Sequence, residues 1–136
     1  MFRFPLFLAA LLALALQAPA AESDPYEGLR ADPVLTSGLR WIAVADRIRK
    51  NCPDISARTF RALGYINSLM SHARDLGYDR STIRAFVDDN AEQDRVKSEA
   101  MAYLVQQGVE PDDQQSYCTV GQSEIARRSQ IGVLLR

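Results

Sequence analysis

The chain has 136 residues, with 16 lysines and arginines against 17 aspartates and glutamates, and a formal net charge of −1. A chain of this length accommodates one domain with its own core and is too short for two. The near balance of charge excludes the strongly basic surface by which proteins bind nucleic acid, so we expect no nucleic-acid partner.

Residues 1–20 have the three parts of a secretory signal peptide. A single cation, Arg3, precedes an unbroken apolar run over residues 6–16, and Ala18-Pro19-Ala20 then offers small residues to a signal peptidase. The run is well short of the roughly 20 apolar residues that span a bilayer. We therefore expect cleavage after Ala20, a periplasmic location and no transmembrane segment in the mature chain. An uncleaved membrane anchor is the less favoured alternative.

Residues 21–33 (AESDPYEGLRADP) contain two prolines, a glycine and scattered charges without a period, which predicts a flexible leader. Over residues 34–136 the apolar side chains recur at helical spacing, which predicts one helical domain. The first helix is expected over about 35–51, and Pro53 ends it because the residue before a proline is disfavoured in the α conformation. Its apolar face consists of Trp41, Val44, Ala45, Ile48 and Cys52.

Four further helices follow in the pattern. The second begins near residue 54 or 56 and ends at Gly77, the third follows Asp79, and the fourth runs from residue 89 or 90 to Gly108. The fifth follows the acidic turn at 110–113 and reaches about residue 129. The predicted core face of the second helix comprises Ile55, Thr59, Leu63, Ile66, Met70 and Ala73. The expected fold is an all-α single domain of four to five helices.

Cys52 and Cys118 are the two cysteines of the chain. An even number of cysteines in an exported protein favours a disulfide. Two alternatives are weaker, because a redox-active pair is more often Cys-x-x-Cys and a zinc site needs two further ligands that one histidine cannot supply. We expect a disulfide that staples the helices and stabilises the fold by about 4 kcal/mol.

Other candidate chemistry is weak. His72, the one histidine, has no nucleophile or orienting residue supplied by a motif, so an ordinary boundary histidine is favoured. The segment DDNAEQDRVKSE partly imitates a calcium loop, but Gln93 stands where that loop requires glycine, and a helix cap explains the same residues. We predict no catalytic, cofactor-binding or metal site, and a non-enzymatic protein.

Near the C-terminus, Glu124 and Arg128 are four residues apart, so they are expected to pair across one helical turn while Arg127 points elsewhere. The final apolar turn can either pack internally or bind a partner. We expect it to form an exposed interaction surface made of Ile131, Leu134 and Leu135.

Several motifs together resemble one family of small exported proteins. They are RKNC followed by DISAR, LGYDRSTIRAFVDD, AMAYLVQQGV, and C-x-x-G-x-x-E-I-A-x-x-S-x-I-G-x-L-L at the end. The family is a domain of unknown function from alphaproteobacteria of the Rhodobacter and Paracoccus type. The resemblance implies a periplasmic protein without an assigned activity, in which Cys52 and Cys118 form a shared bridge. It also implies a partner in an inner-membrane respiratory complex.

Together these observations predict a periplasmic helical protein that binds another protein, as an accessory factor of a membrane complex. The alternative, from a different class, is a binder of small ligands or an acid-stress holdase that exposes apolar surface at low pH.

Overall fold

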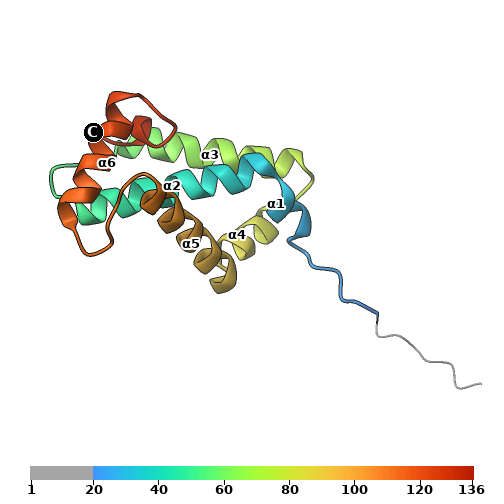
Figure 1. Cartoon of the computed structure of the whole chain (residues 1–136). Coiled ribbons are helices and arrows are strands. Elements are labelled where there is room, and N and C mark those ends of the chain that lie inside the picture. The colour runs from blue at the N-terminus through green and yellow to red at the C-terminus, as the bar shows by residue number, and fades with distance from the viewer. Residues whose placement is uncertain (1–19) are drawn as a thin grey trace, which may run out of the picture.

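The computed structural model describes residues 20–136, and the predicted signal peptide lies outside the described residues apart from Ala20. These residues form six α-helices and one 3-10 turn, with no β-strand among them (Figure 1). In chain order they are α1 (Glu27–Ala31), α2 (Pro33–Asn51), α3 (Thr59–Asp75), α4 (Arg80–Asp88), α5 (Asn90–Gln106), α6 (Gln114–Ala126) and η1 (Gly132–Leu134).

The all-α, single-domain prediction is confirmed, and α2 to α6 correspond to the five predicted helices. The remaining helix, α1, was not predicted. The prediction of a flexible leader over residues 21–33 is wrong for residues 27–31, because they are helical and belong to the folded unit. Leu29 is 1% exposed within the core, and the ring of Tyr26 packs edge-on against Phe86 with centroids 5.5 Å apart. A buried leucine and an aromatic contact thus order a segment whose local composition predicts flexibility.

Helix α2 is the centre of the domain and contacts α1, α3, α5, α6 and η1 (Figure 1). Asp32 caps its N-terminus by accepting a hydrogen bond from the Leu35 amide at 2.8 Å. The helix ends at Asn51, two residues before Pro53, where the sequence predicts its end. Because α2 contacts nearly every other element, the helices from both ends of the chain pack against it.

The caps of α4 and α5 follow the predicted residues. Asp79 accepts a hydrogen bond from the Thr82 amide at 2.7 Å, and Asp89 accepts one from the Glu92 amide at 3.0 Å. Gly77 and Gly108 follow α3 and α5 with φ of +99° and +107°, a left-handed conformation that favours glycine. Short-range capping chemistry therefore sets these boundaries.

Two clusters of buried apolar side chains form the core. The larger surrounds the cysteines between α2, α5, α6 and the C-terminal turn, and the smaller joins α1, α2, α3 and α4. Members of the larger cluster include Val44, Ile48, Leu104, Tyr117, Ile131 and Leu135. Members of the smaller are Leu29, Leu35, Leu69, Ala73, Ile83 and Phe86. Most of the buried apolar side chains therefore lie at the end of the domain that holds both cysteines.

The last residues of the chain pair with the connection between α2 and α3. Ser56 and Arg136 exchange two backbone hydrogen bonds of 2.8 and 2.9 Å, and the Arg58 amide donates to the Leu134 carbonyl at 2.8 Å. These bonds surround an isolated antiparallel bridge between Ala57 and Leu135. The C-terminus is thereby part of the folded domain.

Among residues 20–136, no helix combines the length and the apolar character that a membrane crossing requires.

Candidate interaction surface

Helix α3 has apolar residues on two different faces. The face toward the core carries Ala62, Tyr65, Leu69 and Ala73, of which Leu69 and Ala73 are buried. Of the predicted positions, Ile55 and Ala73 are buried. Leu63, Ile66 and Met70 are rotated away from the core face, so the sequence-based choice was wrong for these three. Both sets step by three or four residues, and periodicity alone does not separate them.

The second apolar face of α3 is open to solvent. Phe60 is 92% exposed, Leu63 is 52% exposed and Ile66 is 38% exposed, while Met70 is partly buried. These four residues follow one another at spacings of three and four, which places them along one side of the helix. We call this surface the α3 face. A nearly fully exposed phenylalanine beside two exposed aliphatic side chains is unusual in a surface that contacts only water.

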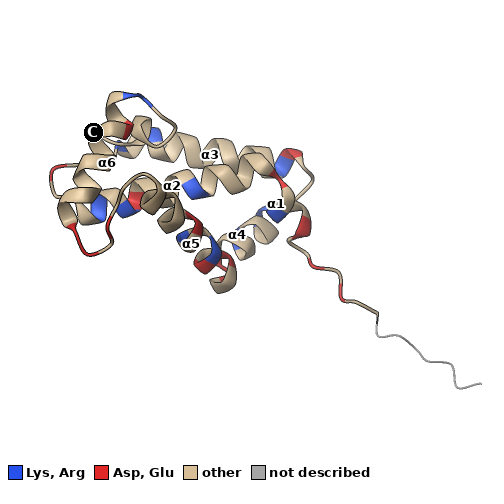
Figure 2. Ribbon diagram, viewed as in Figure 1, with Lys and Arg blue, Asp and Glu red and all other residues tan. Residues whose placement is uncertain are grey.

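Cations flank one end of the α3 face. Arg58, Arg61 and Arg136 line a shallow recess beside Phe60. None of the three forms an ion pair with a carboxylate of residues 20–136. The middle of α3, from Ala62 to Ser71, carries no charged residue, and Figure 2 shows this helix as largely uncharged along its length. The surface therefore combines an aromatic anchor, an apolar stripe and a positive rim.

The predicted interaction surface at the C-terminus is corrected by the structure. Ile131 is 1% exposed, Leu134 is 3% exposed and Leu135 is 0% exposed, and all three belong to the larger core cluster. They are buried because the backbone around them pairs with residues 56–58 and because Gly132 lies directly against the Glu124 carbonyl. A side chain at position 132 would collide with that backbone, so glycine permits the close approach.

The predicted disulfide between Cys52 and Cys118 is present, with the two Cα atoms 5.1 Å apart. It joins the C-terminal end of α2 to α6, where Gly121 lets the helices approach, because a Cβ there would lie 2.6 Å from Ile48 and Ile55 side-chain carbons. Asp54 lies close to both sulfurs. With both cysteines oxidised, these three residues offer no thiolate to a metal, and the cystine is structural.

Glu124 is fully buried in α6 and fixes the C-terminal segment. Tyr103 donates a hydrogen bond to it at 2.7 Å, and the Arg127 guanidinium and the Ser129 hydroxyl donate as well. Burial is the largest influence and raises the pKa of Glu124, but the hydrogen bonds from Ser129, Tyr103 and Arg127 together outweigh it and lower the pKa.

The pairing of Glu124 with Arg127 corrects the predicted pair with Arg128. Helix α6 ends at Ala126, and Arg128 has a left-handed φ of 50°, so a four-residue helical spacing no longer applies there. The chain must turn at this point for η1 to return to the core.

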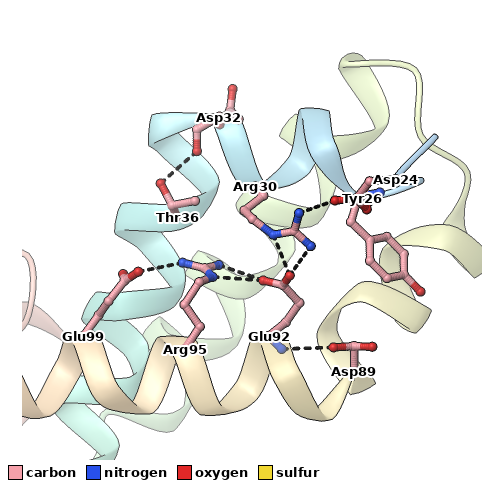
Figure 3. A network of polar contacts seen from close by, with 9 residues as sticks. All are labelled: Asp24, Tyr26, Arg30, Asp32, Thr36, Asp89, Glu92, Arg95 and Glu99. Atoms are coloured by element: carbon pink, nitrogen blue, oxygen red, sulfur yellow. Dashed lines mark hydrogen bonds and ion pairs between the residues drawn. The ribbon is translucent and has the colours of Figure 1, made fainter. Parts of the chain in front are cut away.

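A second buried glutamate, Glu92 of α5, joins this helix to α1 (Figure 3). One of its oxygens accepts a hydrogen bond from Arg30 Nε of α1 at 2.6 Å, and the other accepts one from Arg95 Nε at 3.0 Å. Arg95 also donates to Glu99 at 2.8 Å. The segment that partly imitates a calcium loop is thus a helix cap followed by an ion-pair network, and the carboxylate of Glu92 is engaged by two arginines.

His72 joins α3 to the start of α2. Its Nε2 lies 3.0 Å from Oδ1 of Asp32, the carboxylate that caps α2. Burial is the largest influence on Asp32 and raises its pKa, but hydrogen bonds from the Leu35 amide and His72 outweigh it, so the pKa is lowered. This contact positions two helices, as expected of a boundary histidine.

Comparison with known proteins identifies one family whose sequence pattern this chain matches. The model of a family of unknown function (DUF5333) matches residues 27–136, which is most of the chain and begins where α1 begins. The chain belongs to this family. No curated protein and no solved structure matched it. The resemblance to an uncharacterised family is confirmed, and the alphaproteobacterial origin and export of the family stay predictions.

Proposed function

We propose that this member of the family is a non-enzymatic interaction domain of the periplasm that binds another protein through the α3 face. The observation that carries the proposal is the 92% exposure of Phe60, which lies with Leu63 and Ile66 on a helix that packs on the core through an adjoining face. Exposed aromatic residues in an apolar setting are the side chains that most often dominate the free energy of protein association.

Three further features support this function. The signal-peptide pattern and the cystine fit an oxidising compartment. The buried carboxylates Glu92 and Glu124 form ion pairs with arginines, so both have a structural role that supports a non-enzymatic function. The positive rim at Arg58, Arg61 and Arg136 fits a partner with acidic residues around an apolar groove. The first partner to test is a respiratory complex of the inner membrane.

The test is a photo-crosslinking experiment on the exported protein in intact cells of its own host. A photoreactive amino acid at position 63 is expected to give one discrete protein adduct that fractionates with the inner membrane. The same amino acid at position 105, where Val105 is also half exposed but lies on α5, serves as the matched control. No adduct at 63, or equal adducts at both positions, would contradict the proposal.

The energetic test uses the purified partner. The change Phe60→Ser is expected to weaken binding by at least tenfold, because truncation of a central aromatic anchor costs roughly 2 kcal/mol or more. Val105→Ser should leave the affinity within about twofold. Sedimentation of the wild-type protein alone should give a monomer. A dimer that Phe60→Ser dissociates would mean that a second copy covers the α3 face, which would overturn the proposed partner.

A further inference from the structure

A separate groove is lined by residues of α2, of α5 and of the end of α4. Figure 1 shows the positions of these three helices. The volume of the groove is about 380 Å³, within the range of roughly 300–1,000 Å³ found for small-molecule sites. Ile42 and Ala43 of α2 form one wall, and Val96 and Ala100 of α5 form the other. None of the residues of the α3 face lines it, so it is independent of the proposed protein-binding surface.

The groove is apolar at one end. Leu39, Phe86 and Val87 line it there, and Val87 is 46% exposed. Gln93 donates a hydrogen bond to the Val87 carbonyl at 3.1 Å, which joins the first turns of α5 to the last turn of α4 at this end. A bound apolar chain would remove the Val87 side chain from water.

The other end of the groove is cationic. Arg47 and Lys97 line it from the two facing helices, and both are exposed. Neither forms an ion pair within residues 20–136. Arg47 Nη2 lies 4.0 Å from the Met101 sulfur, which places this end beside the C-terminal half of α5.

The acidic residues of the groove are already neutralised. Asp46 pairs with Lys50 at 2.6 Å and with Arg49 at 2.5 Å. Burial is the largest single influence and raises the pKa of Asp46, but Lys50 and Arg49 together outweigh it, so the pKa is lowered. Glu92 is held by two arginines that do not line the groove. The unpaired charges that face a ligand are therefore positive, although the whole chain carries a slight negative charge.

We propose that this groove binds a single-chain amphiphilic anion, of the class of fatty-acid carboxylates. The carboxylate lies between Arg47 and Lys97, where two cations from facing helices can both donate hydrogen bonds to it. The alkyl chain extends over Ile42, Ala43 and Val96 toward Val87. The lining residues from Leu39 to Lys50 cover about 16 Å of α2 at 1.5 Å per residue, which suits an extended chain rather than a compact ring.

The test is calorimetric titration of the mature protein with dodecanoate below the concentration at which it forms micelles. Saturable binding is expected, and the double variant Arg47→Ala/Lys97→Ala should weaken it about tenfold through loss of charge-assisted hydrogen bonds. The matched control is Arg80→Ala/Arg84→Ala, which removes two exposed cations of α4 outside the groove and should leave the affinity unchanged.

Two further measurements define the chemistry. Val87→Asp, at a position that is 46% exposed, should weaken dodecanoate binding at the apolar end. Dodecyltrimethylammonium, which has the same alkyl chain and the opposite charge, should not bind. The proposal is overturned if dodecanoate does not saturate the wild-type protein, if the Arg47/Lys97 double variant binds it with full affinity, or if the cationic amphiphile binds equally well. Phe60→Ser should leave dodecanoate binding intact. The titration therefore tests the groove separately from the protein-binding role of the α3 face.

Discussion

At the C-terminus, residues 134–136 pair with residues 56–58 and the Cys52–Cys118 disulfide ties α6 to α2. We call this region the cystine end. At the N-terminus, α1 is held by the buried side chain of Leu29 and by the ion pair of Arg30 with Glu92 (Figure 3). We call this region the ion-pair end. The cystine end is attached by a covalent bond and by most of the core. The ion-pair end is attached by one buried leucine, the contact of Tyr26 with Phe86 and a set of charges.

The two ends should therefore respond to different conditions. The cystine end resists opening until the whole domain unfolds, because its cross-link and its core residues connect α2, α5 and α6. The ion-pair end can release the short α1 while the other helices stay packed, because few buried contacts hold it. Substitutions confined to one end show whether their effect stays local.

The largest effect is expected from removal of the cystine. The variant Cys52→Ser/Cys118→Ser opens a cross-link between residues 66 apart, which should lower the free energy of unfolding by about 4 kcal/mol in the chain-entropy model. Urea unfolding at neutral pH measures the change, and chemical reduction of the wild type should give a similar loss. A loss below about 1 kcal/mol would mean that the core alone fastens the cystine end.

Two matched leucine substitutions compare the ends directly. Leu135→Ala removes a fully buried side chain at the cystine end and should cost about 3 kcal/mol, because the cavity cannot close while the tail is held in place. Leu29→Ala removes an equally buried side chain, but its cost is limited to the free energy that docks α1, which we expect to be about 1–2 kcal/mol.

The same urea experiments give both values. Leu29→Ala should also reduce the slope of the unfolding free energy against urea concentration, because α1 would already be exposed before the other helices unfold. An equal loss for both variants, with unchanged urea dependence, would show that the two ends unfold as one unit.

The buried carboxylate of Glu124 stabilises the cystine end. Glu124→Gln should lower the free energy of unfolding by about 2 kcal/mol at neutral pH, because the charge-assisted bonds from Arg127 and Ser129 are weakened inside the core. Glu110→Gln, at an exposed site, is the control and should stay within about 0.5 kcal/mol of the wild type.

The difference in unfolding free energy between the wild type and Glu124→Gln should depend on pH with a defined sign. Folding lowers the pKa of Glu124 below its usual value of 4.5, so the unfolded chain takes up a proton more readily than the folded one. The stabilisation by Glu124 is complete above the unfolded-state pKa of 4.5 and is lost as the pH falls through the lower folded-state pKa. The difference between wild type and Glu124→Gln should therefore shrink in acid. A difference that grows in acid would contradict the direction of the shift.

The parts of this fold that sequence predicts are those set by short-range chemistry. Pro53, Asp79 and Asp89 locate helix ends because each acts on the backbone within a few residues. The disulfide is predictable because the sequence predicts export and contains two cysteines, which leave one pairing. Both inferences are independent of how the helices pack.

The errors share one physical origin, which is that they depend on tertiary contacts. Helix α3 offers two apolar faces, and the choice between them is made by the helices it meets, so Phe60 was missed as a surface residue. The surplus of apolar positions on α3, too many for one buried face, is the signal that could have indicated it. Leu135 is buried by a pairing with a segment nearly eighty positions away, which no local pattern reports.

The smallest effect is expected at the ion-pair end. Glu92→Gln removes the charge that joins Arg30 of α1 to Arg95 of α5, both of which keep partial access to water. We expect a loss of about 1 kcal/mol, since the arginines can regain hydration, and a faster exchange of the α1 amides by several-fold with no change in α6. Hydrogen exchange measured by mass spectrometry resolves the two helices. The matched control is Glu99→Gln, which removes the other carboxylate bound to Arg95 without touching α1. If Glu92→Gln accelerates exchange equally in α1 and α6, the two ends are not independent; if only α1 responds, the ion-pair end opens by itself while the cystine end stays closed.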